Sequence, residues 1–141
     1  MITWLANSEQ ETEQFGEAFA KDLKGGDFLA LIGPLGSGKT AFTRGICRGL
    51  KSRIEAHSPS FTLVNFYPGN LEVVHMDLYR FNGNLEELGW DELPDSKRVI
   101  IVEWAEKATG NLPGVRYDIF FEITGADTRT IRISKIDGAG N

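Results

Sequence analysis

The sequence predicts a three-layer α/β fold in which helices flank a mixed sheet of about seven strands. The chain has 141 residues, which is the length of one domain. Two compact apolar runs, 27–32 and 99–102, are typical of strands buried on both faces. Segments rich in β-formers at 61–77 and 115–136 add an antiparallel component to that sheet.

The first elements are a strand, a helix and a second strand. Residues 1–6 read as a short strand, and Ser8 with Glu11 forms a capping-box pattern that begins a helix. Apolar side chains recur at helical spacing as far as Leu23, and the glycines at 25–26 end the helix. The buried-type strand 27–32 follows, then a Gly-rich turn at 33–40 and a helix over 41–50.

The second half of the chain is richer in strands. Residues 61–66 and 71–76 flank a Pro-Gly-Asn turn and predict a hairpin, and a short helical stretch is expected around 85–88. Strands are predicted at 99–102, 115–123 and 130–136. We therefore expect one domain over residues 1–136 and a flexible tail over 137–141.

Composition excludes several classes of protein. The net charge is −5 and the pI is near 5.0, which argues against a dedicated nucleic-acid binder and predicts no DNA partner. No apolar run is long enough to span a bilayer, so no membrane role is expected. The N-terminus lacks a secretory signal, and a single cysteine, Cys47, cannot form an internal disulfide, so a cytoplasmic location is expected.

One motif carries the chemistry. Residues Gly33–Thr40 read GPLGSGKT and match G-x-x-x-x-G-K-[ST], the P-loop, between a strand and a helix as that motif requires. The glycines let backbone N–H groups wrap around phosphates, and the helix N-terminus adds a positive dipole. Lys39 would reach the β- and γ-phosphates and the Thr40 hydroxyl would bind Mg²⁺. The fold is therefore predicted to be that of a P-loop NTPase.

Two acidic residues end neighbouring strands and are candidate partners of the metal. Asp77 follows the predicted strand 71–76, and Glu103 follows 99–102 in the Walker B form of four apolar residues and an acid. Either could hold Mg²⁺ directly or through water, and either could orient the attacking water. The spacing does not distinguish between them.

The segment Ser58-Pro-Ser-Phe-Thr-Leu-Val64 lies where P-loop hydrolases carry their first switch loop. Ser58, Ser60 or Thr62 could supply a hydroxyl to the metal or the γ-phosphate. An ordinary loop that leads into a strand explains the segment equally well.

Basic residues follow the P-loop. Arg44, Arg48 and Lys51 are spaced to share one helix face, and Arg53 follows them. This face could contact an acidic partner or tRNA phosphates, but a solvated face is the simpler interpretation. Arg80 could pair with a partner or a phosphate.

The remaining candidates favour structural roles. His57 and His75 are too few and too badly spaced for a metal site, and His75 is expected to pack or hydrogen-bond near Asp77. Trp4 and Trp90 read as core or rim aromatics, and Cys47 as a buried small hydrophobe.

Three functions fit these features. The chain lacks the Asn-Lys-x-Asp guanine motif, so an ATPase is favoured over a G protein. A small P-loop kinase is an alternative, although no basic lid insertion is visible. A non-catalytic nucleotide-sensing interaction module is another.

The motifs GPLGSGKTAFTRG, SPSFTLV, HMDLYRF, VEWAEK and a late Thr-Arg-Thr strand, in this order, resemble the TsaE (YjeE) family over nearly the whole chain. These are bacterial P-loop ATPases of tRNA threonylcarbamoyladenosine (t6A) biosynthesis. The resemblance implies an ATPase, dependent on ATP and Mg²⁺ and slow alone, that supports a TsaB–TsaD complex acting on adenosine 37 of tRNA. Contact with tRNA would be indirect.

The resemblance also assigns site residues. Phosphate contacts would come from Leu35, Gly36, Ser37, Gly38, Lys39, Thr40 and Ala41. Asp77 and Glu103 match acids near the metal and the attacking water, and both are candidate metal ligands with Thr40. Thr12 matches a residue near the adenine, Trp104 follows the family's glutamate, and Arg129 lies in a strand with a late nucleotide contact. Pro34, Ser60 and Ala105 depart from the residues most frequent in the family.

Overall fold

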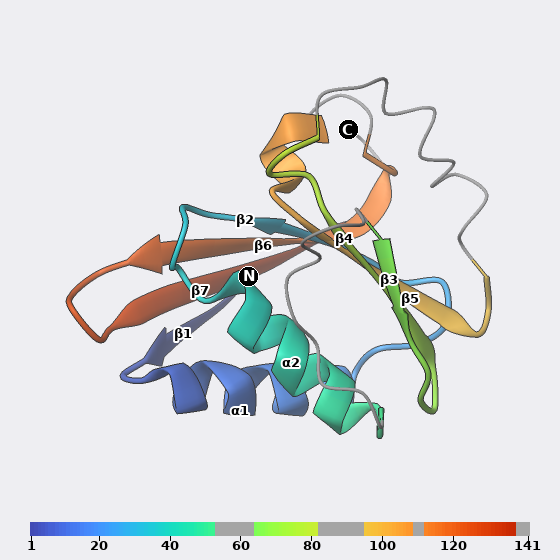
Figure 1. The fold of residues 1–141 in the computed structure, drawn as a ribbon, viewed down its shortest axis with the longest axis horizontal. Helices are drawn as coiled ribbons and strands as arrows, with labels where there is room; N and C mark the ends of the chain where they lie inside the picture. The colour runs from blue at the N-terminus through green and yellow to red at the C-terminus, as the bar shows by residue number, and fades with distance from the viewer. Residues whose placement is uncertain (53–63, 82–94, 109–111, 138–141) are drawn as a thin grey trace.

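The structure is a computed structural model that describes residues 1–52, 64–81, 95–108 and 112–137. In these ranges it contains strands β1 (Ile2–Ala6), β2 (Phe28–Ile32), β3 (Val64–Tyr67), β4 (Glu72–Asp77), β5 (Arg98–Glu103), β6 (Val115–Ile123) and β7 (Arg129–Asp137), helices α1 (Glu9–Ala20) and α2 (Lys39–Gly49), and the 3₁₀ helix η3 (Ala105–Ala108) (Figure 1). None of the described helices is long and apolar enough to cross a membrane.

The described strands form one mixed sheet in the order β1-β7-β6-β2-β5-β4-β3. The central strand β2 is parallel to both neighbours, β5 and β6, and β4 is parallel to β5. The outer pairs β1–β7, β6–β7 and β3–β4 are antiparallel. The predicted mixed α/β sheet is confirmed. Its parallel centre brings the carboxyl ends of β2, β4 and β5 to one edge, which is where ligands bind in such sheets.

Alternate residues of β2 face two separate cores. Leu29 and Leu31 pack with α1 and α2 on one face, whereas Phe28 and Ala30 pack with η3 on the other. Figure 1 shows α1 and α2 side by side on one face of the sheet, and η3 on the opposite side. Both faces of β2 are therefore covered, which explains its uninterrupted apolar sequence.

Helices α1 and α2 touch backbone to backbone. A Cβ on Gly45 would lie 1.9 Å from the carbonyl oxygen of Glu13, and one on Gly16 would lie 2.2 Å from that of Phe42. No side chain larger than hydrogen fits at either position without moving a helix. The contact fixes α1 against α2, the helix that begins at the end of the P-loop.

Several boundaries differ from those that the sequence predicted. α2 begins two residues earlier than expected and ends at Gly49, so Lys51 lies outside the helix, with φ of 63°. Asp137 pairs with Val115 as the last residue of β7, so it belongs to the sheet and not to a tail. The predicted helical stretch at 85–88, the start of the hairpin at 61–63 and residues 138–141 lie outside the described residues.

Two predicted core residues are confirmed. Cys47, on the buried face of α2, is 1% exposed. Trp4 packs against the same core and stacks on Phe15, with 5.0 Å between the ring centroids. Trp90 lies outside the described residues.

Candidate functional site

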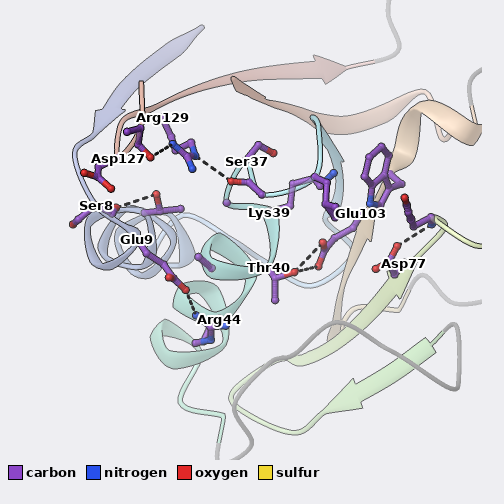
Figure 2. A pocket seen from close by; sticks show the side chains of 18 of the residues that line it. Ser8, Glu9, Ser37, Lys39, Thr40, Arg44, Asp77, Glu103, Asp127 and Arg129 are labelled. Carbon is purple, nitrogen blue, oxygen red and sulfur yellow. Dashed lines mark hydrogen bonds and ion pairs between the residues drawn. The ribbon is translucent and has the colours of Figure 1, made fainter. Parts of the chain in front are cut away.

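A cavity of about 1070 Å³ opens over the P-loop. Figure 2 shows Asp77, Glu103, Lys39 and Thr40 at one end, with Ser8, Asp127 and Arg129 at the other. Every described residue that the sequence proposed for the site contributes to its lining: Thr12, Leu35, Gly36, Ser37, Gly38, Lys39, Thr40, Ala41, Asp77, Glu103, Trp104 and Arg129.

The P-loop backbone has the conformation that its glycines predict. Gly36 and Gly38 have φ of 78° and 105°, in the left-handed region that favours glycine. Gly38 is the N-cap of α2 and has no side-chain hydrogen bond to the first turn of that helix. The N-terminal N–H groups of α2 are thus left to a ligand, as in an anion-binding site.

The side chain of Lys39 is held inside this loop. Its Nζ donates to the carbonyl oxygen of Gly33 and lies 3.5 Å from the centroid of the Trp104 ring. Trp104 adopts a φ of 59°, a conformation that costs a non-glycine residue roughly 1 kcal/mol or more. That strained backbone turns the ring towards Lys39, and Tyr79 packs on the ring at a centroid distance of 4.8 Å.

Thr40 and Glu103 contact each other directly. The Thr40 hydroxyl donates to the Glu103 carboxylate, with both oxygens 3.1 Å away. Glu103 is 2% exposed, and its backbone pairs in register with Asp77 on the neighbouring strand β4. The two acids that the sequence could not rank thus stand side by side, and Glu103 is the one bonded to the P-loop hydroxyl.

The electrostatics of the site follow from burial. Burial lowers the pKa of the Lys39 ammonium, and the nearby carboxylates of Glu106 and Glu103 oppose that shift. Burial raises the pKa of Asp77; the N–H of Tyr79, which donates to its carboxylate at 2.9 Å, opposes the shift, and the charge of Glu103 adds to it. The carboxylates and the buried ammonium would each be stabilised by a ligand that brings both a cation and phosphate oxygens.

The residues present fit a phosphate group. Ser37 is 1% exposed, and its hydroxyl has no hydrogen-bond partner among the described residues. Gly38 lies against Thr12 of α1, whose Cγ2 would be 3.3 Å from a Cβ at that position. An unsatisfied buried hydroxyl is costly unless a ligand or water completes it. The P-loop therefore offers an anion the buried Ser37 hydroxyl as a donor, beside the close contact between Gly38 and Thr12.

The residues also fit Mg²⁺ in its usual P-loop environment. No group of three or more His, Cys, Asp or Glu side chains arranged to hold a metal occurs within residues 1–52, 64–81, 95–108 and 112–137. Mg²⁺ in nucleotide sites instead uses one or two protein oxygens together with phosphates and waters. Thr40, Asp77 and Glu103 offer oxygens of that kind.

The far end of the cavity was only partly predicted. Arg129 donates from Nε to the carbonyl oxygen of Gly36, 3.1 Å away, and from Nη1 to that of Thr128, 2.8 Å away, which ties the β6–β7 turn to the P-loop. Asn7, Ser8, Glu9 and Asp127 also line this end and were missed. Ala6 pairs with Arg129 across β1 and β7, but that pairing has no signal in the sequence.

Two arginines of the basic face predicted on α2 are paired with acids of α1. Arg44 donates to Glu13 at 2.7 Å and to Glu9 at 3.2 Å, and Arg48 donates to Glu13 at 2.5 Å. Both side chains therefore join α2 to α1.

The prediction for His75 is confirmed, since it is buried two residues before Asp77 on β4 and bonds to Glu103 and Tyr67. Arg80 lines the cavity. The proposed switch-loop residues Ser58, Ser60 and Thr62, with Arg53 and His57, lie outside the described residues.

Comparison with known proteins identifies the family. The model of the family described as threonylcarbamoyl adenosine biosynthesis protein TsaE matches residues 6–131. The chain belongs to the TsaE family. A TsaE named as a tRNA threonylcarbamoyladenosine biosynthesis protein in Bacillus subtilis is 37% identical over 96% of this chain and 86% of its own. One of the same name from Treponema pallidum is 32% identical over 92% and 98%, respectively.

The TsaE fold is supported by a solved structure as well. The crystal structure of Bacillus subtilis YdiB matches with a TM-score of 0.81 and 35% identity, over 96% of this chain and 85% of that one. The family assignment predicted from GPLGSGKT, HMDLYRF and the other motifs is confirmed.

Proposed function

We propose that this TsaE-family chain is a cytoplasmic, Mg²⁺-dependent ATPase that supports the TsaB–TsaD complex in threonylcarbamoylation of adenosine 37 of tRNA. One observation carries the ATPase proposal: the buried Lys39 ammonium and the Thr40–Glu103 pair open into the same cavity above the P-loop. Membership in a family named for t6A biosynthesis supports the pathway.

ATP would bind with its phosphates in the loop from Leu35 to Ala41. The N–H groups at the start of α2 would donate to phosphate oxygens, and the Ser37 hydroxyl would gain the partner that it lacks among the described residues. Lys39 would leave the Gly33 carbonyl for the β- and γ-phosphates, because the charged phosphate is the stronger acceptor. Thr12 and Arg129 would close the sides of the phosphate and nucleoside end.

Hydrolysis would proceed by in-line attack of water on the γ-phosphate. Bound Mg²⁺ would supply positive charge at the β- and γ-phosphate oxygens. The Thr40 hydroxyl would hold the metal, while the adjacent carboxylates of Asp77 and Glu103 would hold its waters and orient the attacking one. Lys39 would neutralise the charge that develops on the transferred phosphoryl group.

The partner assignment rests on the resemblance to the family. Arg44 and Arg48 are engaged with acids of α1, so they offer little free positive charge to tRNA phosphates. The net charge of −5 points the same way. We infer that contact with tRNA is indirect, and that hydrolysis is slow until TsaB–TsaD completes the site.

Binding and turnover test the proposal with one variant and one matched control. We expect Lys39→Ala to weaken Mg·ATP binding at least tenfold and to abolish phosphate release, because it removes the buried cation. Lys21→Ala removes an exposed lysine at the end of α1 and should behave as wild type. Equal binding and release in wild type and Lys39→Ala would refute the ATPase assignment.

The two alternatives predict different results in the same assays. ATP-dependent appearance of a phosphorylated small molecule without any protein partner would favour a kinase. Asp77→Ala and Glu103→Ala variants that lose hydrolysis but keep full t6A formation would favour a nucleotide-sensing module.

A further inference from the structure

A line of hydrogen-bonded side chains runs from Glu103 across β4 to the edge strand β3. Glu103 Oε2 lies 2.5 Å from His75 Nε2, and His75 Nδ1 lies 3.2 Å from the Tyr67 hydroxyl. The hydroxyl oxygen of Tyr67 in turn accepts from Nδ2 of Asn65 at 3.4 Å. At its other end the line reaches the P-loop, where Thr40 donates to Glu103.

The sheet register makes this line possible. His75 pairs with Asn65 on β3 and with Ile101 on β5, two residues before Glu103. Side chains two residues apart on a strand share a face of the sheet. His75 therefore lies on the face that carries Glu103, one strand further from the P-loop.

The line is buried to a degree that needs an explanation. His75 is 0% exposed, Tyr67 2% and Glu103 2%, and the neighbouring core residues Val73 and Ile101 are apolar. Polar groups buried in such a core are costly unless their hydrogen bonds are complete. An apolar residue at position 75 would pack there at lower cost if packing were the requirement.

The donors and acceptors agree along the whole line. A carboxylate only accepts, so His75 Nε2 carries the ring hydrogen and donates to Glu103. His75 Nδ1 then accepts from the Tyr67 O–H, whose oxygen accepts from Asn65. Tyr67 thus selects the ring tautomer that can hold Glu103.

We propose that His75, backed by Tyr67, is a positioning residue that fixes the Glu103 carboxylate at the metal and water side of the nucleotide site. This role rests on the ATPase function proposed above. Glu103 has three side-chain torsions and stands at the end of β5, so its carboxylate can turn unless a partner holds it. The bond from His75 anchors Oε2 and keeps the carboxylate against Thr40.

Three variants separate positioning from packing. His75→Leu removes both ring hydrogen bonds and keeps an apolar side chain. His75→Gln can still donate to Glu103 through its amide nitrogen and accept from Tyr67 through its amide oxygen. Tyr67→Phe removes only the hydroxyl. Val73→Ala, in the same strand and core, is the control: it should lower stability but leave the hydrogen bonds among Glu103, His75 and Tyr67 in place.

Steady-state phosphate release with TsaB–TsaD gives the main readout. Loss of a hydrogen-bond partner behind a metal-site residue costs about 10- to 100-fold in activity. We expect His75→Leu to lower kcat in that range while KM for Mg·ATP changes less than about twofold. Tyr67→Phe should fall between wild type and His75→Leu, and His75→Gln should recover most of the kcat.

The outcomes distinguish this proposal from the one on which it depends. If wild type releases no phosphate with TsaB–TsaD, the ATPase function fails and the role of His75 falls with it. If wild type is active and His75→Leu keeps its kcat, the positioning role is overturned and the ATPase function stands. A loss of kcat in Val73→Ala equal to that in His75→Leu would also overturn it.

A second readout needs neither nucleotide nor turnover. Long-range ¹H–¹⁵N NMR of the nucleotide-free chain reports which ring nitrogen carries the hydrogen, and His57→Gln assigns the signals because the chain has two histidines. We expect the hydrogen on Nε2 of His75, and a changed Nε2 signal in Glu103→Gln. A hydrogen on Nδ1 alone would contradict the proposed line.

Discussion

Gly45→Ala probes the contact that holds α1 against the P-loop helix. The new Cβ would lie 1.9 Å from the Glu13 carbonyl oxygen, and an ordinary contact is at least 3.4 Å. The helices would have to separate by about 1.5 Å, or the backbone at Glu13 would have to shift by that amount. The oxygen belongs to the backbone and the backbone fixes the position of the Cβ, so no side-chain rotation can relieve the overlap.

The net effect can be estimated because two contributions oppose each other. Alanine in place of glycine favours an isolated helix by about 1 kcal/mol. Overpacking in a well-packed interior costs about 1 to 3 kcal/mol, and an overlap of this size lies at or beyond the upper end. We expect a net destabilisation of about 2 kcal/mol, which corresponds to a fall of roughly 7 °C in Tm for a domain of this length.

Thermal unfolding and Mg·ATP binding measure the two consequences. Since Thr12 of α1 forms the wall beside Gly38, displacement of α1 should also weaken Mg·ATP binding severalfold. Gln14→Ala, at an exposed position of α1, is the control and should change stability by less than about 0.5 kcal/mol. A higher Tm for Gly45→Ala, as the helix propensity alone would give, would show that the helices are not in close contact at Gly45.

Other predictions concern single groups in the site and the core. Burial raises the pKa of Asp77 above its ordinary value of 3.8. The protonated carboxyl therefore stabilises the folded state below pH 3.8, and this stabilisation is lost as the pH rises through the pKa that Asp77 has in the folded chain. Asp77→Asn should therefore raise Tm at pH 7 and abolish phosphate release, and the gain in Tm should vanish near pH 3.8; an unchanged Tm at pH 7 would contradict the burial argument. Burial also raises the pKa of Cys47 to about 12. The thiol should therefore react with a thiol reagent at pH 8 only as guanidinium unfolds the protein. Stoichiometric labelling of the folded chain would instead show that the thiol is accessible. ATP should change tryptophan emission when Lys39 leaves the Trp104 ring, and the change should be absent in Trp104→Phe but present in Trp4→Phe; the reverse pattern would place the signal elsewhere.

Local signals in the sequence were sufficient to predict most helices and strands, and the end of the site that holds the P-loop and the two acids. The N-cap predicted at Ser8 is confirmed, with the Ser8 side chain accepting from the N–H of Glu11 at 3.1 Å; the Glu11 side chain accepts from the N–H of Asn7, one residue before the position that a capping box predicts. Strand β6 has the expected bounds, and β2 differs by one residue. The P-loop and the two strand-end acids were found because each depends on a few adjacent residues.

Features that depend on sheet order could not be predicted in the same way. Glu103 bonds to Thr40 because β5 lies next to β2, whereas Asp77 on β4 is one strand further away. The same order brings His75 to Glu103 and the end of β1 to Arg129. Pairing between strands far apart in sequence has no local signature, so the apolar runs predicted the strands but not their neighbours.

Partner-stimulated phosphate release is the direct test of a P-loop ATPase that needs TsaB–TsaD. Mg·ATP hydrolysis by this chain would be measured alone, with TsaB–TsaD, and with TsaB–TsaD plus Lys39→Ala in place of wild type. We expect slow release by the chain alone, at least tenfold faster release with the complex, and none above background for Lys39→Ala. Release that is unchanged by TsaB–TsaD, or that persists in Lys39→Ala, would contradict a P-loop ATPase completed by its partner.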